Sequence, residues 1–366
     1  MASFKKDLSL TNVDMGSPFG DATSQLARLY SASTNVSNVI RLQLSISLFQ
    51  QAELLLLGEP SVARYNSLLL RFLDFSESVI SDHRVSSNLL LSSSMRDQQL
   101  DFSEYTKEHY SRLFSAFDDY HYFDEASHLL SVRFDRNFID PKQYRGKSVL
   151  DFGCGGGRYS YALASLTGGH VLGVDFSQAN VDFAASKSSI ALQRGLSNIP
   201  SFERDDVVCS TLDTSKYDLV FCNGVLHHSQ SIPGGLAQIK KLLKPDGQAW
   251  LYIIGAPGGI KWNTVQLLRI LLNDVPPAFA RAYFAMAGVP SNRIFYILDH
   301  ILVPINTLTE PRELEAMFKE SGFTSWRRLY RGTDFDVAEL QANSGLPEEE
   351  AYWIYGNAEL RYLINA

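Results

Sequence analysis

The chain has 366 residues, of which 45% are hydrophobic and 20% charged, and its formal net charge is −7. Such values are typical of a globular protein with one large core or two smaller ones. The acidic balance disfavours nucleic acid as a partner, because proteins that bind it in bulk present a basic surface. Three cysteines without CxxC spacing predict reduced thiols and neither a disulfide framework nor a zinc site.

The sequence predicts an N-terminal helical region over residues 1–100. The first twenty residues lack the apolar core of a signal peptide. Residues 39–58 are apolar but carry Arg41 and Glu53, which makes them too polar for a membrane span. Apolar residues recur at helical spacing over 35–80, interrupted at Gly58, and this pattern predicts a helical hairpin. We therefore expect a cytoplasmic protein without a membrane-spanning segment.

A different pattern begins at Lys147 and belongs to a predicted second domain, residues 101–366. Short apolar runs alternate with segments of helical periodicity, which predicts a parallel sheet with helices on both faces. The predicted strands are 148–153, 170–177, 217–223 and 247–255. Two more are predicted within TSWRRLYRG (324–332) and LRYLIN (360–365), after a helix that Thr309 caps, Pro311 opens and Gly322 closes. In such sheets, ligands bind beyond the carboxyl ends of the strands.

Residues 256–310 are too long and too apolar for a simple connection between these elements. They predict a helical insertion after the strand 247–255, which we expect to cap the active site as a lid. A dimer interface is the alternative, and composition leaves a homo-oligomer open. Asp299 and His300 within the insertion either line an acceptor pocket or form a satisfied buried pair.

The glycine-rich run after the first predicted strand carries the main functional signal. Asp151 ends the strand, and Gly153 and Gly155–Gly157 follow. A phosphate-binding P-loop would need a Lys-Ser/Thr pair that is missing here, and Arg158 stands where a dinucleotide fold needs its third glycine or alanine. An acid on the strand would repel a pyrophosphate, whereas it would favour a ligand with an ammonium group and a sulfonium.

At this point the sequence resembles the class I S-adenosylmethionine-dependent methyltransferases. VLDFGCGGG, VLGVDFS, SFERDDVV and YDLVFCNGVLHH resemble four motifs of that family, in the family's order. The resemblance implies a Rossmann-like, doubly wound sheet of strand order 3-2-1-4-5-7-6 with the last strand antiparallel. It also implies S-adenosyl-L-methionine as cofactor.

The resemblance further implies which residues hold the cofactor. The glycine loop would contact the methionyl part, Asp175 the ribose hydroxyls, and Asp206 the adenine amine, with Asp205 where the family usually has glycine. Asp175 has an alternative role as a cap of the helix that follows, and Arg158 an alternative role as a solvated helix residue. The full set of cofactor candidates is Asp151, Gly153, Cys154, Gly155, Gly157, Arg158, Asp175, Phe176, Asp205, Asp206, Asn223, Gly224 and Tyr110, to which we add Tyr105 and His109 as residues across the pocket.

His227 and His228 are the best-placed candidates for a general base, because histidine titrates near neutral pH. Their alternative role is packing beneath the cofactor, and no neighbouring ligands predict a metal site. We therefore expect an enzyme that methylates a small organic acceptor at oxygen, nitrogen or carbon by in-line transfer. Alternatives are a protein or tRNA methyltransferase, an NAD-dependent dehydrogenase and a non-catalytic interaction module.

Overall fold

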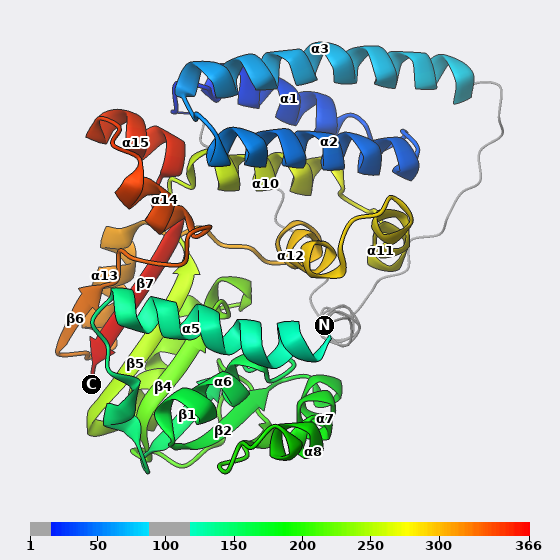
Figure 1. The fold of residues 1–366 in the computed structure, drawn as a ribbon. Helices are drawn as coiled ribbons and strands as arrows, with labels where there is room; N and C mark the ends of the chain where they lie inside the picture. Colours follow the sequence, from blue (N-terminus) through cyan, green and yellow to red (C-terminus); the bar gives the residue numbers. More distant parts are fainter. Residues whose placement is uncertain (1–15, 88–117) are drawn as a thin grey trace. The chain divides into compact units, whose positions relative to one another are not determined.

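The structure is a computed structural model that describes residues 16–87 and 118–366 (Figure 1). It divides the chain into two compact units, each built from separate segments. Among the described residues, the helical unit comprises 16–87, 256–304 and 344–358. The sheet unit comprises 118–255, 305–343 and 359–366. The predicted domain boundary near residue 100 lies outside the described residues and stays a prediction.

A seven-stranded sheet organises the sheet unit, and its order is β3-β2-β1-β4-β5-β7-β6. Strands β1 to β5 pair in parallel, whereas β7 runs antiparallel to both β5 and β6. The strand order and the antiparallel last strand are therefore confirmed, as are the six predicted strands. The strands are β1 (Ser148–Phe152), β2 (His170–Asp175), β3 (Ser201–Arg204), β4 (Tyr217–Asn223), β5 (Leu243–Ile254), β6 (Ser325–Arg328) and β7 (Glu359–Asn365).

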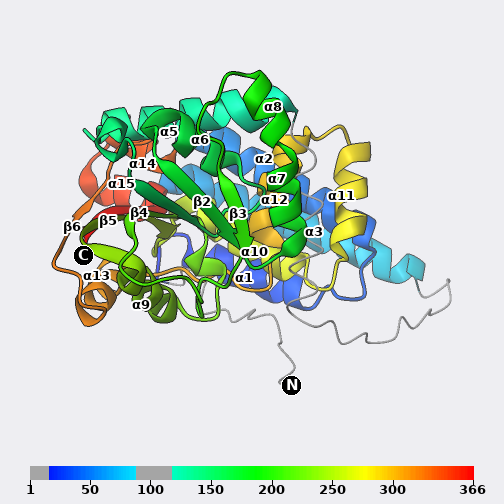
Figure 2. The ribbon, with the colours of Figure 1, turned by 90° about the horizontal axis from the view of Figure 1, so that it is seen from below.

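Helices cover both faces of this sheet, with α5 and α6 on one side and α9 and α13 on the other (Figure 2). Short helical turns follow β4 (η4) and precede α5 and β1 (η2, η3). The elements are η2 (Tyr120–Asp124), α5 (Glu125–Arg136), η3 (Pro141–Tyr144), α6 (Arg158–Thr167), α7 (Gln178–Ser186), α8 (Ser188–Gln193), η4 (Leu226–His228), α9 (Ile232–Leu242), α13 (Pro311–Glu320) and α14 (Val337–Asn343).

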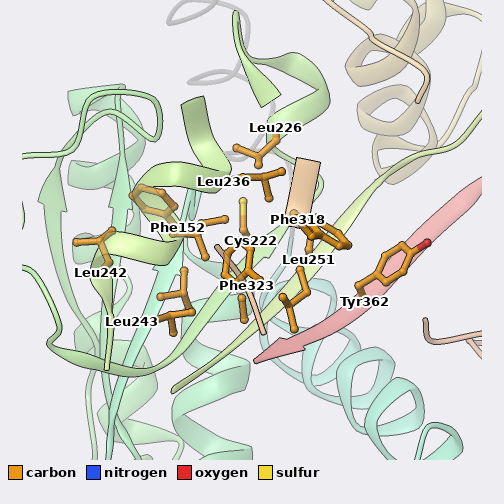
Figure 3. Packing of buried hydrophobic residues seen from close by; sticks show 14 of the residues in the cluster. Phe152, Cys222, Leu226, Leu236, Leu242, Leu243, Leu251, Phe318, Phe323 and Tyr362 are labelled. Atoms are coloured by element: carbon orange, nitrogen blue, oxygen red, sulfur yellow. The ribbon is translucent and has the colours of Figure 1, made fainter. Parts of the chain in front are cut away.

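Side chains alternate between the two faces of the sheet along each strand, so there is one hydrophobic core on each face. Phe152, Cys222 and Leu251 come from three neighbouring strands and pack with Leu236 of α9 and Phe318 of α13 (Figure 3). On the other face, Val149, Phe221 and Trp250 pack against α5 and α6. The central strands β1 and β4 are buried along most of their length, so their sequences are mainly apolar, whereas β3 and β6 at the sheet edges are largely exposed.

The helical unit confirms the predicted N-terminal hairpin and shows that residues 256–310 are mainly helical. Figure 1 shows α10 lying along α1 and α2, and these helices are in direct contact. The helices are α1 (Gly20–Ser31), α2 (Asn38–Leu57), α3 (Val62–Ser87), α10 (Gly259–Leu271), α11 (Pro277–Met286), α12 (Ser291–Ile301) and α15 (Glu348–Tyr355). No helix in the described ranges combines the length and the apolar character that crossing a bilayer requires.

Buried polar groups join the segments of the helical unit. Asn263 of α10 donates through Nδ2 to the hydroxyls of Thr23 and Tyr65, each at 3.0 Å. Arg269 of α10 is 1% exposed and donates to the carbonyls of His300 at 3.0 Å and Val303 at 2.8 Å. These carbonyls lie at the carboxyl end of α12, where a helix leaves acceptors without intrahelical donors. Arg269 therefore satisfies that helix end from a neighbouring helix.

The start of α13 differs from the prediction. Pro311 does occupy the first turn and Gly322 does follow the helix with a φ of 82°. Thr309, however, does not cap it: the N-cap position is Glu310, without a side-chain cap. The backbone N–H of Thr309 instead donates to the carbonyl of Ile254 at 3.1 Å, because this segment pairs with the end of β5.

Candidate active site

The loop between β1 and α6 is held close to the neighbouring strands. The N–H groups of Gly153 and Cys154 donate to the carbonyl of Val174 in β2, at 2.9 and 2.8 Å. Gly153 has a φ of 88°, and a Cβ there would lie 2.6 Å from the side chain of Val225. The position therefore requires glycine, both for its backbone conformation and for the space available.

At the end of this loop, α6 begins without a side-chain cap. Gly155 and Gly157 have φ values of 51° and 83°, and Gly157 is the N-cap residue of α6. Because Gly157 has no side chain that could cap the helix, the first N–H groups of α6 are left for a ligand or solvent. Cys154 is buried in this loop, and burial raises the pKa of its thiol, so it stays neutral.

Asp151 lies beneath the loop and is 3% exposed. One carboxylate oxygen accepts a hydrogen bond from the Ser160 hydroxyl at 2.6 Å. Burial raises the pKa of Asp151 to about 7; the Ser160 bond opposes this shift, and the charge of Asp175 adds to it. A cationic group bound nearby would favour the ionised form.

Asp175 ends β2 and links the glycine loop to α7. Its Oδ2 accepts from the N–H of Gly155, and its Oδ1 accepts from the N–H of Ser177 and the amide of Asn180, each at 3.0 Å. Burial raises the pKa of this carboxyl, and the three hydrogen bonds oppose that shift. Three of about four acceptor sites of the carboxylate are thus used within the protein. Phe176, the next residue, is half-buried.

Asp205 and Asp206 follow β3 and differ in their surroundings. Asp205 is buried and accepts from the hydroxyl of Ser210 at 2.5 Å and the N–H of Thr211 at 3.1 Å. Asp206 is exposed, and its Oδ1 accepts from the N–H of Val208 at 2.8 Å. Asp205 therefore closes its own loop, whereas the Asp206 carboxylate faces outward at the strand end.

The end of β4 places a second turn beside the glycine loop. Asn223 accepts a hydrogen bond from the indole of Trp250 at 3.0 Å, so its side chain is engaged with β5. Gly224 has a φ of 80°, and its N–H donates to the carbonyl of Tyr252 at 3.0 Å. Together with Val225, these residues fix the direction of the histidine turn that follows.

The two histidines lie in η4, with ring centroids 4.0 Å apart. His227 is 1% exposed, while His228 is half-buried and places Nδ1 2.9 Å from the carbonyl of Ile305. Because a carbonyl can only accept, the proton of the ring lies on Nδ1 at this contact. In the neutral ring, the lone pair is then on Nε2, which is the form that a general base requires.

Arg158 and Tyr122 connect the loop to the helices that cover it. Arg158 donates to the carboxylate of Glu125 at 2.9 Å and to the carbonyl of His121 at 2.5 Å, so its guanidinium is not simply solvated. Tyr122, fully buried in the π-helical turn η2, donates its hydroxyl to the carbonyl of Gly156. Sequence patterns did not identify Tyr122, because nothing in YHYFD distinguishes a residue beside the loop from a core aromatic.

Five of the predicted site residues are not among those placed at the strand ends. Tyr105, His109 and Tyr110 lie outside the described residues. Asp299 and His300 belong to the helical unit, where the His300 ring lies edge-on to Trp262 and Tyr296 with centroids 4.7 and 4.6 Å away. Their part in an acceptor pocket stays a prediction.

Comparisons with known proteins match part of this chain to methyltransferases. Residues 144–254 match the family model described as a methyltransferase domain. A ubiquinone biosynthesis O-methyltransferase of Actinobacillus pleuropneumoniae is 34% identical over 105 residues, which are 28% of this chain and 43% of that protein. The enzyme of the same name from Hahella chejuensis is 25% identical over 63% of this chain and 80% of its own length. The chain thus spans less than half of the first of these relatives.

Among solved structures, a geranyl diphosphate C-methyltransferase from Streptomyces coelicolor is 16% identical, with a TM-score of 0.40 over 65% of this chain and 79% of its own. The four predicted motifs lie within or beside the ends of β1 to β4, inside the matched segment. Residues 144–254 of this chain therefore match a methyltransferase domain.

Proposed function

We propose that this protein transfers a methyl group from S-adenosylmethionine to a small organic acceptor. One observation carries the proposal: the glycine loop, Asp175, Asp206 and the His227–His228 turn all lie at the carboxyl ends of four adjacent parallel strands. Ligands of this fold class bind at that edge. The relatives named as O-methyltransferases support an acceptor hydroxyl.

The residues present fit the cofactor. The loop from Gly153 to Gly157 has no side chain at its four glycines, so the methionyl part can approach its main chain and the start of α6 closely. Buried Asp151 favours the ammonium group of that part. Asp175 keeps one acceptor site for the ribose, and the outward carboxylate of Asp206 suits the adenine amine, whereas Asp205 is already engaged. When bound, S-adenosylmethionine supplies an activated methyl group on a sulfonium.

The chain's own residues then position the acceptor and manage its proton. Methylation of a hydroxyl forms an O–C bond, breaks the bond between the methyl carbon and the sulfonium sulfur, and releases the hydroxyl proton together with neutral S-adenosylhomocysteine. We assign Nε2 of His228 to take that proton, because the contact of Nδ1 with Ile305 sets the tautomer and the ring's direction. The buried ring of His227 lies against it, tilted by 57°, and restricts its movement. A cytoplasmic location and self-association stay predictions from the sequence.

Isothermal titration calorimetry tests the proposal at the cofactor step. We expect S-adenosylmethionine and S-adenosylhomocysteine to bind with dissociation constants on the order of micromolar, and NAD not to bind. Binding of NAD alone would favour the dehydrogenase, and binding of neither would favour a non-catalytic module. Incubation with radiolabelled cofactor and separate small-molecule, protein and tRNA fractions then identifies the acceptor class.

A further inference from the structure

The segment that leads into α13 runs along the histidine turn. The N–H of Thr307 donates to the carbonyl of His227 at 2.9 Å, and the carbonyl of Ile305 meets the ring of His228 at 2.9 Å. Two residues further on, Thr309 pairs with Gly255 at the end of β5. Asn306 is therefore fixed between two contacts to the candidate base and its neighbour, within the sheet unit.

The side chain of Asn306 is 4% exposed, and neither its Nδ2 nor its Oδ1 meets a hydrogen-bond partner among the described residues. Asn137 offers a contrast in the same unit: it is also 4% exposed, yet its Nδ2 donates to the carbonyls of Arg133 and Arg331 at 2.8 Å each. Burying an amide without partners is unfavourable, and native proteins rarely retain such a group without a role. The Asn306 amide thus has no hydrogen-bond partner among the described residues at either its nitrogen or its oxygen, whereas the Asn137 amide has partners.

We propose that the Asn306 amide binds the methyl acceptor and selects one that presents a hydrogen-bond donor beside an acceptor. This inference rests on the proposed function and names the chemistry of its second substrate. A carboxamide side chain offers an N–H donor and a carbonyl acceptor on one carbon. Its complement is a carboxamide, a carboxylic acid, or a hydroxyl next to a carbonyl, carried beside the oxygen that receives the methyl group.

Two probes and two variants test this assignment. The probes are 2-hydroxybenzamide, which has the donor–acceptor pair beside a hydroxyl, and phenol, which has only the hydroxyl. Asn306→Leu keeps the approximate volume and removes both polar atoms, and Asn137→Leu is the matched control. Probe affinity is measured by calorimetry on protein saturated with S-adenosylhomocysteine, and melting temperature by calorimetric scanning.

We expect wild type to prefer 2-hydroxybenzamide over phenol by about tenfold or more, the effect of one hydrogen bond. Asn306→Leu should abolish the preference without lowering the melting temperature, because no protein partner is lost. Asn137→Leu should lower the melting temperature and keep the preference. A wild type without the preference, or an Asn306→Leu variant that keeps it, overturns the inference. Failure of wild type to bind S-adenosylhomocysteine overturns the proposed function instead.

Discussion

Asp205 and Asp206 are adjacent in sequence, yet their carboxylates meet different surroundings. Asp205 is buried against Ser210 and Thr211, whereas Asp206 is exposed. We expect Asp206→Ala to weaken S-adenosylhomocysteine binding about tenfold with an unchanged melting temperature. Asp205→Ala should instead destabilise the fold by about 1–3 kcal/mol, because buried donors lose their acceptor. Calorimetry measures S-adenosylhomocysteine affinity and melting temperature for the two variants. If Asp205→Ala loses affinity and Asp206→Ala loses stability, then Asp205 binds the cofactor and Asp206 stabilises the loop.

Asp151 should make stability depend on pH. Its folded pKa of about 7 lies above the unfolded value of about 4. The carboxyl's contribution to stability is therefore fully present below about pH 4 and is lost as pH rises through about 7, by about 1.4 kcal/mol for each pH unit between the two values. Asp151→Asn removes this dependence. In melting curves, the melting temperature of the variant relative to wild type should be higher at pH 8 than at pH 5. The same difference at both pH values contradicts the expectation.

Tyr122 is expected to position the glycine loop rather than to touch a substrate. Its hydroxyl donates to the carbonyl of Gly156 in the loop, whereas the nearby Tyr161 donates to the carbonyl of Ala184 in α7 at 2.9 Å and not to the loop backbone. Tyr122→Phe should lower S-adenosylhomocysteine affinity about tenfold, whereas Tyr161→Phe should not. Tyr161→Phe should lose at least as much stability as Tyr122→Phe, because the Tyr161 hydroxyl also lies 3.2 Å from the hydroxyl of Ser188. Equal affinities in calorimetric titrations would leave Tyr122 a core residue only.

The positions of the acidic residues could be predicted from the sequence more readily than the contacts that their carboxylates make. Asp175 lies at the end of a strand that its apolar run predicts, whereas Asp206 was placed through the resemblance of SFERDDVV to a family motif. That Asp205 turns inward depends on where Ser210 falls after the loop folds, which no spacing rule states. Tyr122 could not be identified for the same reason, because its contact with Gly156 spans 34 positions and depends on the π-helical turn.

At the scale of elements, the glycine loop should tolerate no added side chain. Gly153→Ala would place a Cβ 2.6 Å from Val225 and adopt a φ of 88°. Gly146→Ala is the control, since it has a φ of 67° but no atom within 4 Å of the added Cβ. We expect the control to lose about 1 kcal/mol of stability from backbone strain alone. Gly153→Ala should lose more and bind S-adenosylhomocysteine weakly or not at all; titration and melting of both variants decide this.

Element types were easier to predict than element ends. The apolar runs of β1, β2, β4 and β5 are long enough to identify strands, whereas β3 (SFER) has no such run, and Pro311 and Gly322 mark the start and end of α13. Thr309 was assigned wrongly as its cap, because a threonine before a proline fits the capping pattern equally well when its backbone pairs with a strand. Tertiary pairing with β5 decided between the two, and such pairing is not local information.

At the scale of the whole molecule, sequence patterns did not predict that three separate segments share one helical unit. Helical periodicity indicates an apolar face but not its partner. Trp262, Leu267 and Leu268 of α10 are fully buried in a unit that also contains α1 to α3. The sheet order was available only through the family resemblance. The lid role of residues 256–310 stays a prediction.

Removal of α1 to α3 should therefore expose the apolar surface of α10. We expect a chain that begins at residue 118 to bind a hydrophobic dye strongly and to aggregate, because α10 contacts α1 and α2 directly. A chain that begins at residue 16 is the control and should behave as the full chain does. Size-exclusion chromatography and dye fluorescence compare them. A monodisperse shorter chain would show that α10 does not need these helices.

The position of β7 between β5 and β6 has a consequence for the order of folding. During synthesis, β6 leaves the ribosome before β7, but its pairing with the sheet is through β7 alone. The nascent chain must therefore keep residues 325–328 unpaired, and β5 with an open edge, until residues 359–365 arrive. Such late insertion raises contact order, and it gives chaperones a defined sheet edge to protect.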